Sequence, residues 1–489
     1  MRKTLFLNPP SFEGFDGGAG ARYQARREIR SFWFPTWLAH PAAMVPDSVL
    51  IDAPPAGLQL EDVVARAPEF ELCVIHTSTP SFYSDLRSAE ALKEANPKLT
   101  IGMVGSHVDV LPGESLEKAK AVDFVTRGEF DHTIVEVAEG RPYEAIDGLS
   151  WRHNGEIVHN KPRPVPEDMD ALPHVVDVYK RDLVLENYQV GEALFPYVSF
   201  YTGRGCRSRC TFCLWPQTIE GHRFRVRSPE HVAAEVRKSL DYWPQLREIF
   251  FDDDTLTDNL PHVEAIARQI GPWLAERKMT WSCNAKGNVP YETLKLLKEN
   301  GLRVVTVGFE SGDQEILNNI KKGMKVTRYR QFAEDCHKLG IKMHGCFILG
   351  LPGETKETIE QTLQFAKEID PHTIQCSVAA AYPGTFLYEQ AKREGWLVDD
   401  TTGKLLMVDG FQVTSISYPH LSHTEIFDAA ANFYRQFFFR PKKIAGMVGE
   451  MLTDWNQMKT RLGEAVDFYT YLTKRENRPS AGRGAKATA

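Results

Sequence analysis

Short apolar runs alternate with helical patterns along the first part of the chain. The runs are TLFLN (4–8), SVLID (48–52), LCVIHTS (72–78), TIGMVGS (100–106) and VDFVTRG (122–128). Between them lie segments with helical spacing, such as 83–95, where Leu86, Ala89 and Leu92 recur every three residues. Strands that alternate with amphipathic helices predict a parallel sheet with helices on both faces. We therefore expect a doubly wound, Rossmann-like α/β domain over residues 1–145.

A second series of the same kind begins at residue 196. Its runs are YVSFYTG (197–203), EIFFDDD (248–254), MTWSCN (279–284), RVVTVGFE (303–310), KMHGCFILG (342–350) and HTIQCSVA (372–379). Six β/α units are too few for a closed eightfold barrel. The pattern predicts a partial (β/α)6 barrel over residues 196–420.

The segments around the barrel have other patterns. Residues 146–195 contain GLSWRHNGEIVH, where the Asn154-Gly155 pair predicts a hairpin, followed by a proline-rich linker at 161–173. After the barrel we expect a C-terminal helical segment over 421–475. A polar, disordered tail is expected over 476–489.

Composition and charge narrow the class of protein. The chain has 489 residues, with 42% hydrophobic and 25% charged content, which is typical of globular proteins with more than one domain. Its 58 basic and 65 acidic residues give a net charge of −7, which argues against a nucleic-acid partner. The first residues have too short an apolar run for a signal peptide, and no run is long enough to span a bilayer. These features predict a cytoplasmic protein.

Three of the eight cysteines lie close together in the sequence. Cys206, Cys210 and Cys213 follow the first strand of the second series, in the context GRGCRSRCTFCLWP. A closed zinc site takes four ligands. A 4Fe–4S cluster held by only three thiolates keeps one iron open to a small molecule. A zinc site completed by a distant ligand such as His222 is the alternative.

The surroundings of these cysteines are basic. Arg204, Arg207 and Arg209 are expected to offset the negative charge of thiolates and cluster. The remaining cysteines are scattered among apolar neighbours, and we expect them to be buried filler; they are Cys73, Cys283, Cys336, Cys346 and Cys376.

The run CRSRCTFC resembles the cluster motif of radical S-adenosylmethionine (SAM) enzymes. Later segments are similar to other motifs of that family: FFDDDTLTDN (250–259), GFESG (308–312), FILGLPGE (347–354) and YPGT (382–385). The resemblance implies that Cys206, Cys210 and Cys213 are ligands to a 4Fe–4S cluster. It also implies that SAM is cleaved to a 5′-deoxyadenosyl radical, which abstracts hydrogen from a substrate carbon.

The same resemblance suggests roles for residues at the barrel mouth. Asp253 and Asp254 are the catalytic candidates, since either could accept hydrogen bonds from the SAM amino group or from a substrate hydroxyl. A solvated strand end is the alternative for both. The cofactor-binding candidates are Phe212, Asn284, Glu310, Ser311, Gly350 and Gly353, with Glu310 placed at the SAM ribose and the two glycines near adenine.

Two histidines near the end of the barrel are ambiguous. His420 and His423 could be ligands or proton donors. The alternative is a helix start capped by Ser422 or Thr424, with both histidines at the surface.

Residues 1–140 resemble the cobalamin-binding domain that precedes the barrel in many radical SAM enzymes. The segments NPP, VGSH and VDFVTRGEFDHTI follow that pattern, but the D-x-H-x-x-G motif, whose histidine binds cobalt, is absent after the first strand. A long insert (11–39) stands there instead. Two alternatives remain open: cobalamin is bound without a protein histidine, or the domain lacks the cofactor and the insert shapes the substrate pocket.

Over residues 1 to 475 the chain looks like radical SAM enzymes of hopanoid biosynthesis. This resemblance implies a hopanoid lipid substrate, bacteriohopanetetrol glucosamine, whose aminosugar ring is contracted to a cyclitol ether. Reduced flavodoxin or ferredoxin would donate the electron. The alternatives are a cobalamin-dependent radical SAM methyltransferase or cyclase that acts on another large apolar substrate, and a non-catalytic metal-binding module.

One stretch is compatible with a lipid substrate. Residues 427–452 combine aromatic side chains with Arg435, Arg440, Lys442 and Lys443. Such a stretch would suit peripheral association with the inner face of the membrane. An ordinary core-facing helix pair, broken at Pro441, is the alternative.

Overall fold

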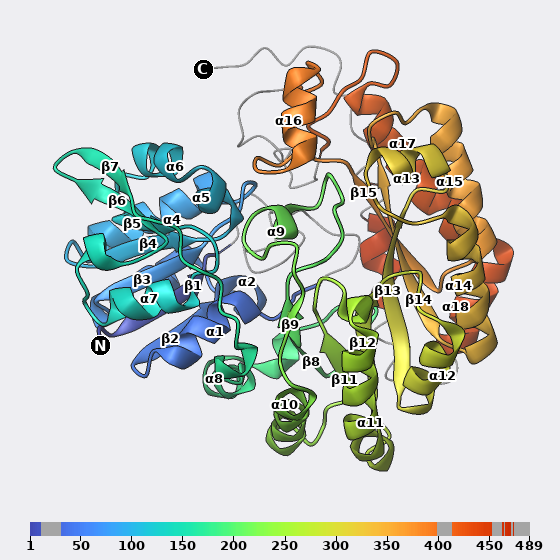
Figure 1. Ribbon diagram of the computed structural model, residues 1–489, viewed down its shortest axis with the longest axis horizontal. Helices are drawn as coiled ribbons and strands as arrows, with labels where there is room; N and C mark the ends of the chain where they lie inside the picture. Colours follow the sequence, from blue (N-terminus) through green and yellow to red (C-terminus); the bar gives the residue numbers. More distant parts are fainter. Residues whose placement is uncertain (11–30, 399–412, 452–461, 464, 471–472, 474–489) are drawn as a thin grey trace.

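The computed structural model describes residues 1–10, 31–398, 413–451, 462–463, 465–470 and 473 (Figure 1). The predicted tail (476–489) and residues 11–30 of the insert lie outside these ranges. The described chain forms two α/β units, drawn from blue to teal and from green to orange in Figure 1, followed by the C-terminal helices in red.

The first unit is built on a seven-stranded sheet. Its strands are β1 (Thr4–Asn8), β2 (Ser48–Asp52), β3 (Leu72–His76), β4 (Thr100–Val104), β5 (Phe124–Thr126), β6 (Leu149–His153) and β7 (Glu156–His159), in the order β2-β1-β3-β4-β5-β6-β7. The first five are parallel. The order 2-1-3-4-5 is that of a doubly wound sheet whose direction of winding reverses between β1 and β3. The predicted Rossmann-like fold is confirmed.

The predicted hairpin joins this sheet instead of standing in the linker segment 146–195. Strand β6 pairs antiparallel with β5, and β7 pairs antiparallel with β6. Leu149 and Ser150 of β6 are buried. The hairpin therefore covers the edge of β5, and the sheet extends past the expected boundary at residue 145.

Helices and short 3-10 turns surround the first sheet and the linker. The helices are α1 (Thr36–Met44), α2 (Ala53–Ala56), α3 (Leu60–Val64), α4 (Phe82–Ala95), α5 (Ser106–Val110), α6 (Pro112–Lys118), α7 (Asp131–Ala138) and α8 (Val176–Asp182). The 3-10 turns are Ala67–Glu69, Tyr143–Ala145, Met169–Ala171 and Leu185–Asn187.

The second unit is an open barrel of six parallel strands. These are β8 (Tyr197–Phe200), β11 (Glu248–Phe251), β12 (Thr280–Ala285), β13 (Leu302–Glu310), β14 (Lys342–Leu349) and β15 (Thr373–Val378), which pair in chain order from β8 to β15. A two-stranded ribbon, β9 (Gly203–Arg204) with β10 (Arg225–Val226), follows β8. The predicted partial (β/α)6 barrel is confirmed.

The second unit and the C-terminal stretch contain further helices, most of which cover the outside of this barrel. They are α9 (Leu214–Gln217), α10 (Pro229–Tyr242), α11 (Leu260–Glu276), α12 (Tyr291–Glu299), α13 (Gln314–Asn319), α14 (Val326–Leu339), α15 (Lys356–Ile369), α16 (Phe386–Arg393), α17 (His423–Phe438) and α18 (Pro441–Met451), with a 3-10 turn at Leu256–Asp258.

The two faces of the barrel strands have different exposure. In β14, Met343 and Phe347 are buried, whereas His344 and Cys346 between them are half-buried. Successive side chains in a strand point to opposite faces, and the helices cover the outer face. The half-buried positions therefore face the interior of the barrel, which solvent reaches.

Helix α17 packs as the core-facing alternative predicts, whereas the described side chains of α18, including Ile444 and Val448, are mostly exposed. Phe433, Tyr434 and Phe437 of α17 are buried. Arg440 forms an ion pair with Asp370 at 2.7 Å, and Lys443 lies 3.4 Å from the same carboxylate. These contacts occupy two of the cations on which a membrane-facing surface would depend. No helix in the described ranges is long and apolar enough to cross a bilayer.

Four of the five scattered cysteines are buried, as predicted: Cys73, Cys283, Cys336 and Cys376. The exception is Cys346, which is only half-buried because it lies on the inner face of β14.

Candidate functional site

The carboxyl ends of the two sheets face each other across a shared interface. Gly384, in the turn after β15, packs so closely on Val110 of α5 that a Cβ there would lie 2.5 Å from the valine side chain and 3.1 Å from Thr218. Trp37 of α1 stacks on Trp215 of α9, with ring centroids 5.7 Å apart and planes within 8°. Helix α9 therefore lies between the two units (Figure 1).

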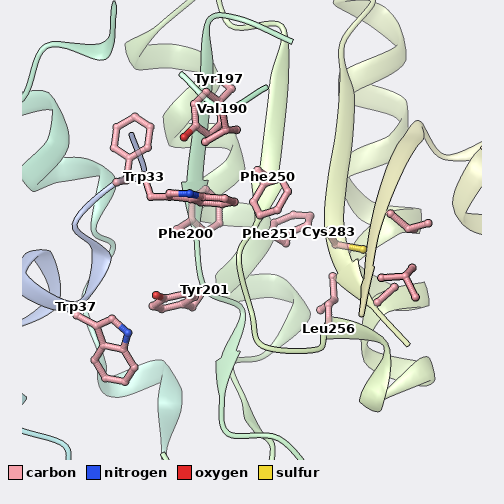
Figure 2. Packing of buried hydrophobic residues seen from close by; sticks show 14 of the residues in the cluster. Trp33, Trp37, Val190, Tyr197, Phe200, Tyr201, Phe250, Phe251, Leu256 and Cys283 are labelled. Atoms are coloured by element: carbon pink, nitrogen blue, oxygen red, sulfur yellow. The ribbon is translucent and has the colours of Figure 1, made fainter. Parts of the chain in front are cut away.

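The described end of the insert contributes aromatic side chains to this interface. Trp33 meets Phe250 of β11 edge to face at 5.2 Å, and Trp37 lies 5.8 Å from Tyr201. Figure 2 shows the Trp33 ring reaching toward Phe250, with Trp37 at the lower left. Residues 31–37 thus pack the first unit against β8 and β11.

A buried ion network crosses the same interface. Arg204, on β9, binds both carboxylate oxygens of Asp131, at 2.6 and 3.1 Å, and also contacts Glu129. Arg225 pairs with Glu129 from β10. Burial alone would raise the pKa of Asp131, but the Arg204 guanidinium outweighs it and the pKa lies below its usual range. Trp37 covers Arg204, whose guanidinium carbon lies 4.4 Å from the ring centroid.

This network corrects one prediction from the sequence. Arg204 forms ion pairs with residues of the first unit and not with the loop that contains Cys206, Cys210 and Cys213 (the cysteine loop). The backbone N–H of Arg207 donates to Asp258, and its guanidinium donates to the Asp258 carbonyl. Arg209 is exposed. The cations that act on the Cys210 thiolate are Lys322 and Lys286 instead.

The three clustered cysteines lie in one loop between β9 and α9. Cys206 and Cys210 are buried and Cys213 is half-buried. Burial raises the pKa of all three thiols, most strongly that of Cys213, whose thiolate is also opposed by those of Cys210 and Cys206. The three sulfurs are therefore close enough to act on one another electrostatically. A bound metal centre compensates such thiolates and deprotonates them outright.

Within the described residues, the cysteine loop does not form a compact ligand set for a single zinc ion. Across the described ranges, no three or more His, Cys, Asp or Glu side chains are grouped for one metal ion. The Nδ1 of His222 lies 2.9 Å from the Ser208 carbonyl oxygen, so this ring has a backbone partner. Thiolates on separate irons of a cluster stand farther apart than those around one zinc.

Gln217, which the sequence did not single out, holds this loop together. Its side-chain amide donates to the carbonyls of Cys210, Thr211 and Cys213, at 3.1, 3.2 and 2.7 Å. Its Oε1 accepts from the backbone N–H of Phe386 in α16 at 2.9 Å. One side chain therefore joins the cysteine loop to the last β/α unit of the barrel.

Asp253 anchors the segment that leads into the cysteine loop. Its Oδ1 accepts hydrogen bonds from the backbone N–H groups of Thr202 (3.0 Å) and Gly203 (2.7 Å) and from the Thr202 hydroxyl. Its Oδ2 is buried and has no hydrogen-bond partner, and burial raises the pKa to about 6. Asp254 is half-buried and acts electrostatically on Cys206 and Cys213.

Two predicted cofactor-binding residues are committed to protein contacts. Asn284 donates to the Asp253 carbonyl at 2.7 Å. The hydroxyl of Ser311 is fully buried and lies 3.1 Å from that of Thr362 in α15. The role of Ser311 toward SAM, which the resemblance of GFESG implies, stays a prediction.

Glu310 ends β13 in a left-handed conformation, with φ of +63°. Its Oε1 accepts from Lys322 Nζ at 2.7 Å. Phe212, before the third cysteine, is half-buried and packs against the core. The predicted roles of Glu310 and Phe212 toward SAM stay predictions.

The predicted glycine turn after β14 needs its glycines. Gly350 and Gly353 have φ of +88° and +89°. The Gly350 N–H donates to Glu354, which is fully buried with its Oε1 unpartnered and its pKa raised by burial to about 8. His420 contacts the Glu354 carbonyl at 3.0 Å, which gives this histidine a structural partner. Ser422 caps α17 as predicted.

A polar row crosses the inner face of the barrel. Asn284, Thr306, His344 and Thr373 are register partners on four neighbouring strands, and all are half-buried. His344 Nδ1 lies 2.7 Å from Thr373 Oγ1, whereas Thr306 Oγ1 is buried without a partner. This row was not predicted from the sequence. Polar residues at alternate positions of KMHGCFIL (342–349) could have indicated that one face of this strand is polar.

Comparisons with known proteins agree with this architecture. Residues 200–366 match the radical SAM superfamily. The chain is 30% identical to an uncharacterised methyltransferase of Pyrococcus horikoshii, over 90% of this chain and 94% of that relative.

Two solved structures share the fold. The methyltransferase TsrM of Kitasatospora setae, a radical SAM enzyme, matches with a TM-score of 0.65 and 16% identity, covering 90% of this chain and 84% of its own. The cobalamin-dependent SAM radical enzyme OxsB matches with a TM-score of 0.68 and 14% identity, covering 97% and 71%.

Proposed function

The chain belongs to the radical SAM superfamily, and on that premise we propose that it is a cobalamin-dependent radical SAM enzyme that transfers a methyl group to a large substrate. Membership of the superfamily implies a 4Fe–4S cluster and SAM as cofactors. The methyl-transfer reaction is supported by the Pyrococcus relative and by TsrM, both named as methyltransferases. The structures of TsrM and OxsB contain cobalamin.

The observation that carries the proposal is the meeting of the two carboxyl edges. Ligands of doubly wound sheets bind beyond the carboxyl ends of the strands. The catalytic face of a β/α barrel is also its carboxyl end. Three contacts join the first unit to the barrel unit: Trp37 with Trp215, Val110 with Gly384, and Asp131 with Arg204. A ligand on the first sheet would therefore lie next to the cysteine loop.

The carboxyl edge of the first sheet is closely packed and carries small polar side chains. A Cβ on Gly105, which has φ of +117°, would lie 2.1 Å from the Thr77 carbonyl oxygen, so only glycine allows this close packing of the loops after β3 and β4. Ser78 lies in the loop after β3, Ser106 is the first residue of α5, and the buried hydroxyl of Thr126 at the end of β5 has no partner. These residues would hold the cobalamin.

Within the barrel, the proposed roles fall on residues of the mouth. Cys206, Cys210 and Cys213 hold the cluster. When bound, the cluster and SAM supply the electron transfer and the radical, and cobalamin supplies the methyl carrier. Glu310 orients the ribose of SAM, and Gly350 and Gly353 let the backbone approach adenine. The aromatic interface around Trp33 and Trp37 excludes water from this side of the barrel.

A second candidate is ring contraction of bacteriohopanetetrol glucosamine to its cyclitol ether. It is supported by the resemblance of residues 1–475 to hopanoid-biosynthesis enzymes and by the polar inner row. This row contains hydrogen-bonding side chains but no lysine or arginine; its members are Asn284, Thr306, His344 and Thr373. Such a surface suits a hydroxyl-bearing sugar better than an anionic group. The lipid tail would require contact with a membrane or carrier, and reduced flavodoxin or ferredoxin would be the electron donor.

The two candidates and a non-catalytic module are separated by one anaerobic experiment. The protein, purified after growth with cobalamin, is incubated with SAM, reduced flavodoxin and bacteriohopanetetrol glucosamine. Iron, sulfide and cobalamin contents are measured first. S-adenosylhomocysteine, 5′-deoxyadenosine and the mass of the lipid are then followed.

Methyl transfer predicts bound cobalamin and S-adenosylhomocysteine formed with methylated product. Ring contraction predicts 5′-deoxyadenosine and a lipid without an added methyl group. Cys210→Ala should abolish SAM cleavage, whereas Cys336→Ala, which alters a buried cysteine of α14, should not. Protein without a cluster, or full SAM cleavage by Cys210→Ala, would refute the proposed function.

A further inference from the structure

Lys322 lies in the turn between α13 and α14, and its side chain is only 14% exposed. Its ammonium nitrogen is 2.7 Å from Glu310 Oε1, and the Glu310 side chain is 8% exposed. A buried ammonium is costly unless it is paired. The ion pair with Glu310 therefore fixes the position of the Lys322 ammonium.

The backbone of β13 is shaped around this pair. The register between β13 and β14 shifts between Gly308 and Glu310. A Cβ on Gly308 would lie 2.3 Å from Glu310 Oε1 and 2.9 Å from Lys322 Nζ. The ion pair thus folds over Gly308. Because Glu310 also has a positive φ, two irregular residues are needed to bring the carboxylate to the lysine.

The same ammonium lies beside the cysteine loop. The ammonium is close enough to Cys210 and Cys213 to act on both side chains electrostatically. The Thr211 backbone N–H donates to the Ile320 carbonyl at 3.0 Å, which fixes the loop to the turn that carries Lys322.

We propose that Lys322 is a positioning residue that raises the reduction potential of the cluster held by Cys206, Cys210 and Cys213. The potential of an iron–sulfur cluster depends on the charge around it. Reduction adds a negative charge, which a neighbouring ammonium stabilises more than it stabilises the oxidised cluster. This inference rests on the proposed ligation by the three cysteines.

The test compares variants of the reconstituted holoprotein. Iron and sulfide contents are measured, and the reduction potential is then determined by an EPR-monitored redox titration without substrate. Lys322→Met should keep the full cluster and shift its potential to a more negative value. Lys322→Arg should stay close to the wild type. Glu310→Gln should shift the potential in the positive direction, because it removes the opposing charge.

The matched control is the adjacent lysine. Lys321 is exposed, and its ammonium lies 4.5 Å from the centroid of the Phe386 ring. Lys321→Met removes the same charge from the same turn and should leave the potential unchanged. A Lys322→Met protein with a full cluster and the wild-type potential would overturn the inference, as would equal shifts in the two methionine variants.

A folding defect is handled by a second comparison. Lys322→Met leaves the Glu310 carboxylate buried without its partner. If that variant does not fold, the double variant Glu310→Gln/Lys322→Met is compared with Glu310→Gln and should have the more negative potential; equal potentials would contradict the inference. A wild-type protein that binds no cluster refutes the proposed function instead.

Discussion

Replacing Asp131 by asparagine should loosen the interface between the two units. Asparagine keeps the shape of the side chain but removes the charge that Arg204 binds through two hydrogen bonds. Both side chains are 1% exposed. Leaving a buried charge without its partner typically costs 3–5 kcal/mol, and we expect about 3 kcal/mol because Glu129 still contacts Arg204.

Hydrogen exchange measured by mass spectrometry reports this loss locally. A change of about 3 kcal/mol in the opening free energy lowers amide protection about 100-fold. The decrease should be confined to interface segments 31–44 and 201–217, while β13–β15 keep their protection. Glu368→Gln, which removes the exposed partner of Arg330, is the control and should change protection by less than about 1 kcal/mol.

The pH dependence checks the cause. The pKa of Asp131 is lowered in the folded protein, so its stabilisation is present above the unfolded pKa and is lost as the pH falls through the lower folded value. The loss of opening free energy caused by Asp131→Asn should be equal at about pH 7 and pH 6, and it should become smaller below about pH 4. Unchanged protection at both interface segments would show that the network does not hold the units together.

Three further predictions address the site. Gln217→Leu removes the hydrogen bonds to three loop carbonyls and should lower the iron retained after gel filtration at least twofold, measured against Gln364→Leu on the exposed face of α15. The folded pKa of Glu354 is raised to about 8, so the wild-type protein should lose stability as the pH rises from about 5 to 8 and the folded carboxyl group loses its proton. Glu354→Gln should not show this loss. Identical thermal melting profiles of the two proteins across this range would refute the prediction. His344→Ala should raise the substrate KM at least tenfold while SAM still binds, and an unchanged KM would show that the inner row does not contact substrate.

The sequence predicted those parts of the molecule that depend on local pattern. Each apolar run became a strand, and the Asn154-Gly155 pair formed the turn between β6 and β7. Ser422 caps its helix because Glu425 follows three residues later, which is a local signal. Fold class followed from the order of these elements.

Contacts between distant residues could not be predicted in this way. Arg204 looked like a partner of the cysteines because it is two residues away in sequence, yet it binds Asp131, which is 73 positions distant. Gln217 gave no signal, since its importance depends on three carbonyls and on Phe386. The half-buried row at His344 could have been found from polar alternation, but only the register shows that its members are neighbours.

The hydrogen bonds of Gln217 bear on how the metal centre is assembled. Zinc fingers are unfolded until their ion arrives, so binding and folding are one event. Here the cysteine loop takes its shape from backbone carbonyls, one glutamine amide and helix α16. We therefore expect iron and sulfide to enter a loop that is already folded, so that cluster insertion is separate from folding of the chain. A protein stripped of its cluster by oxygen should accept a new one without first being unfolded.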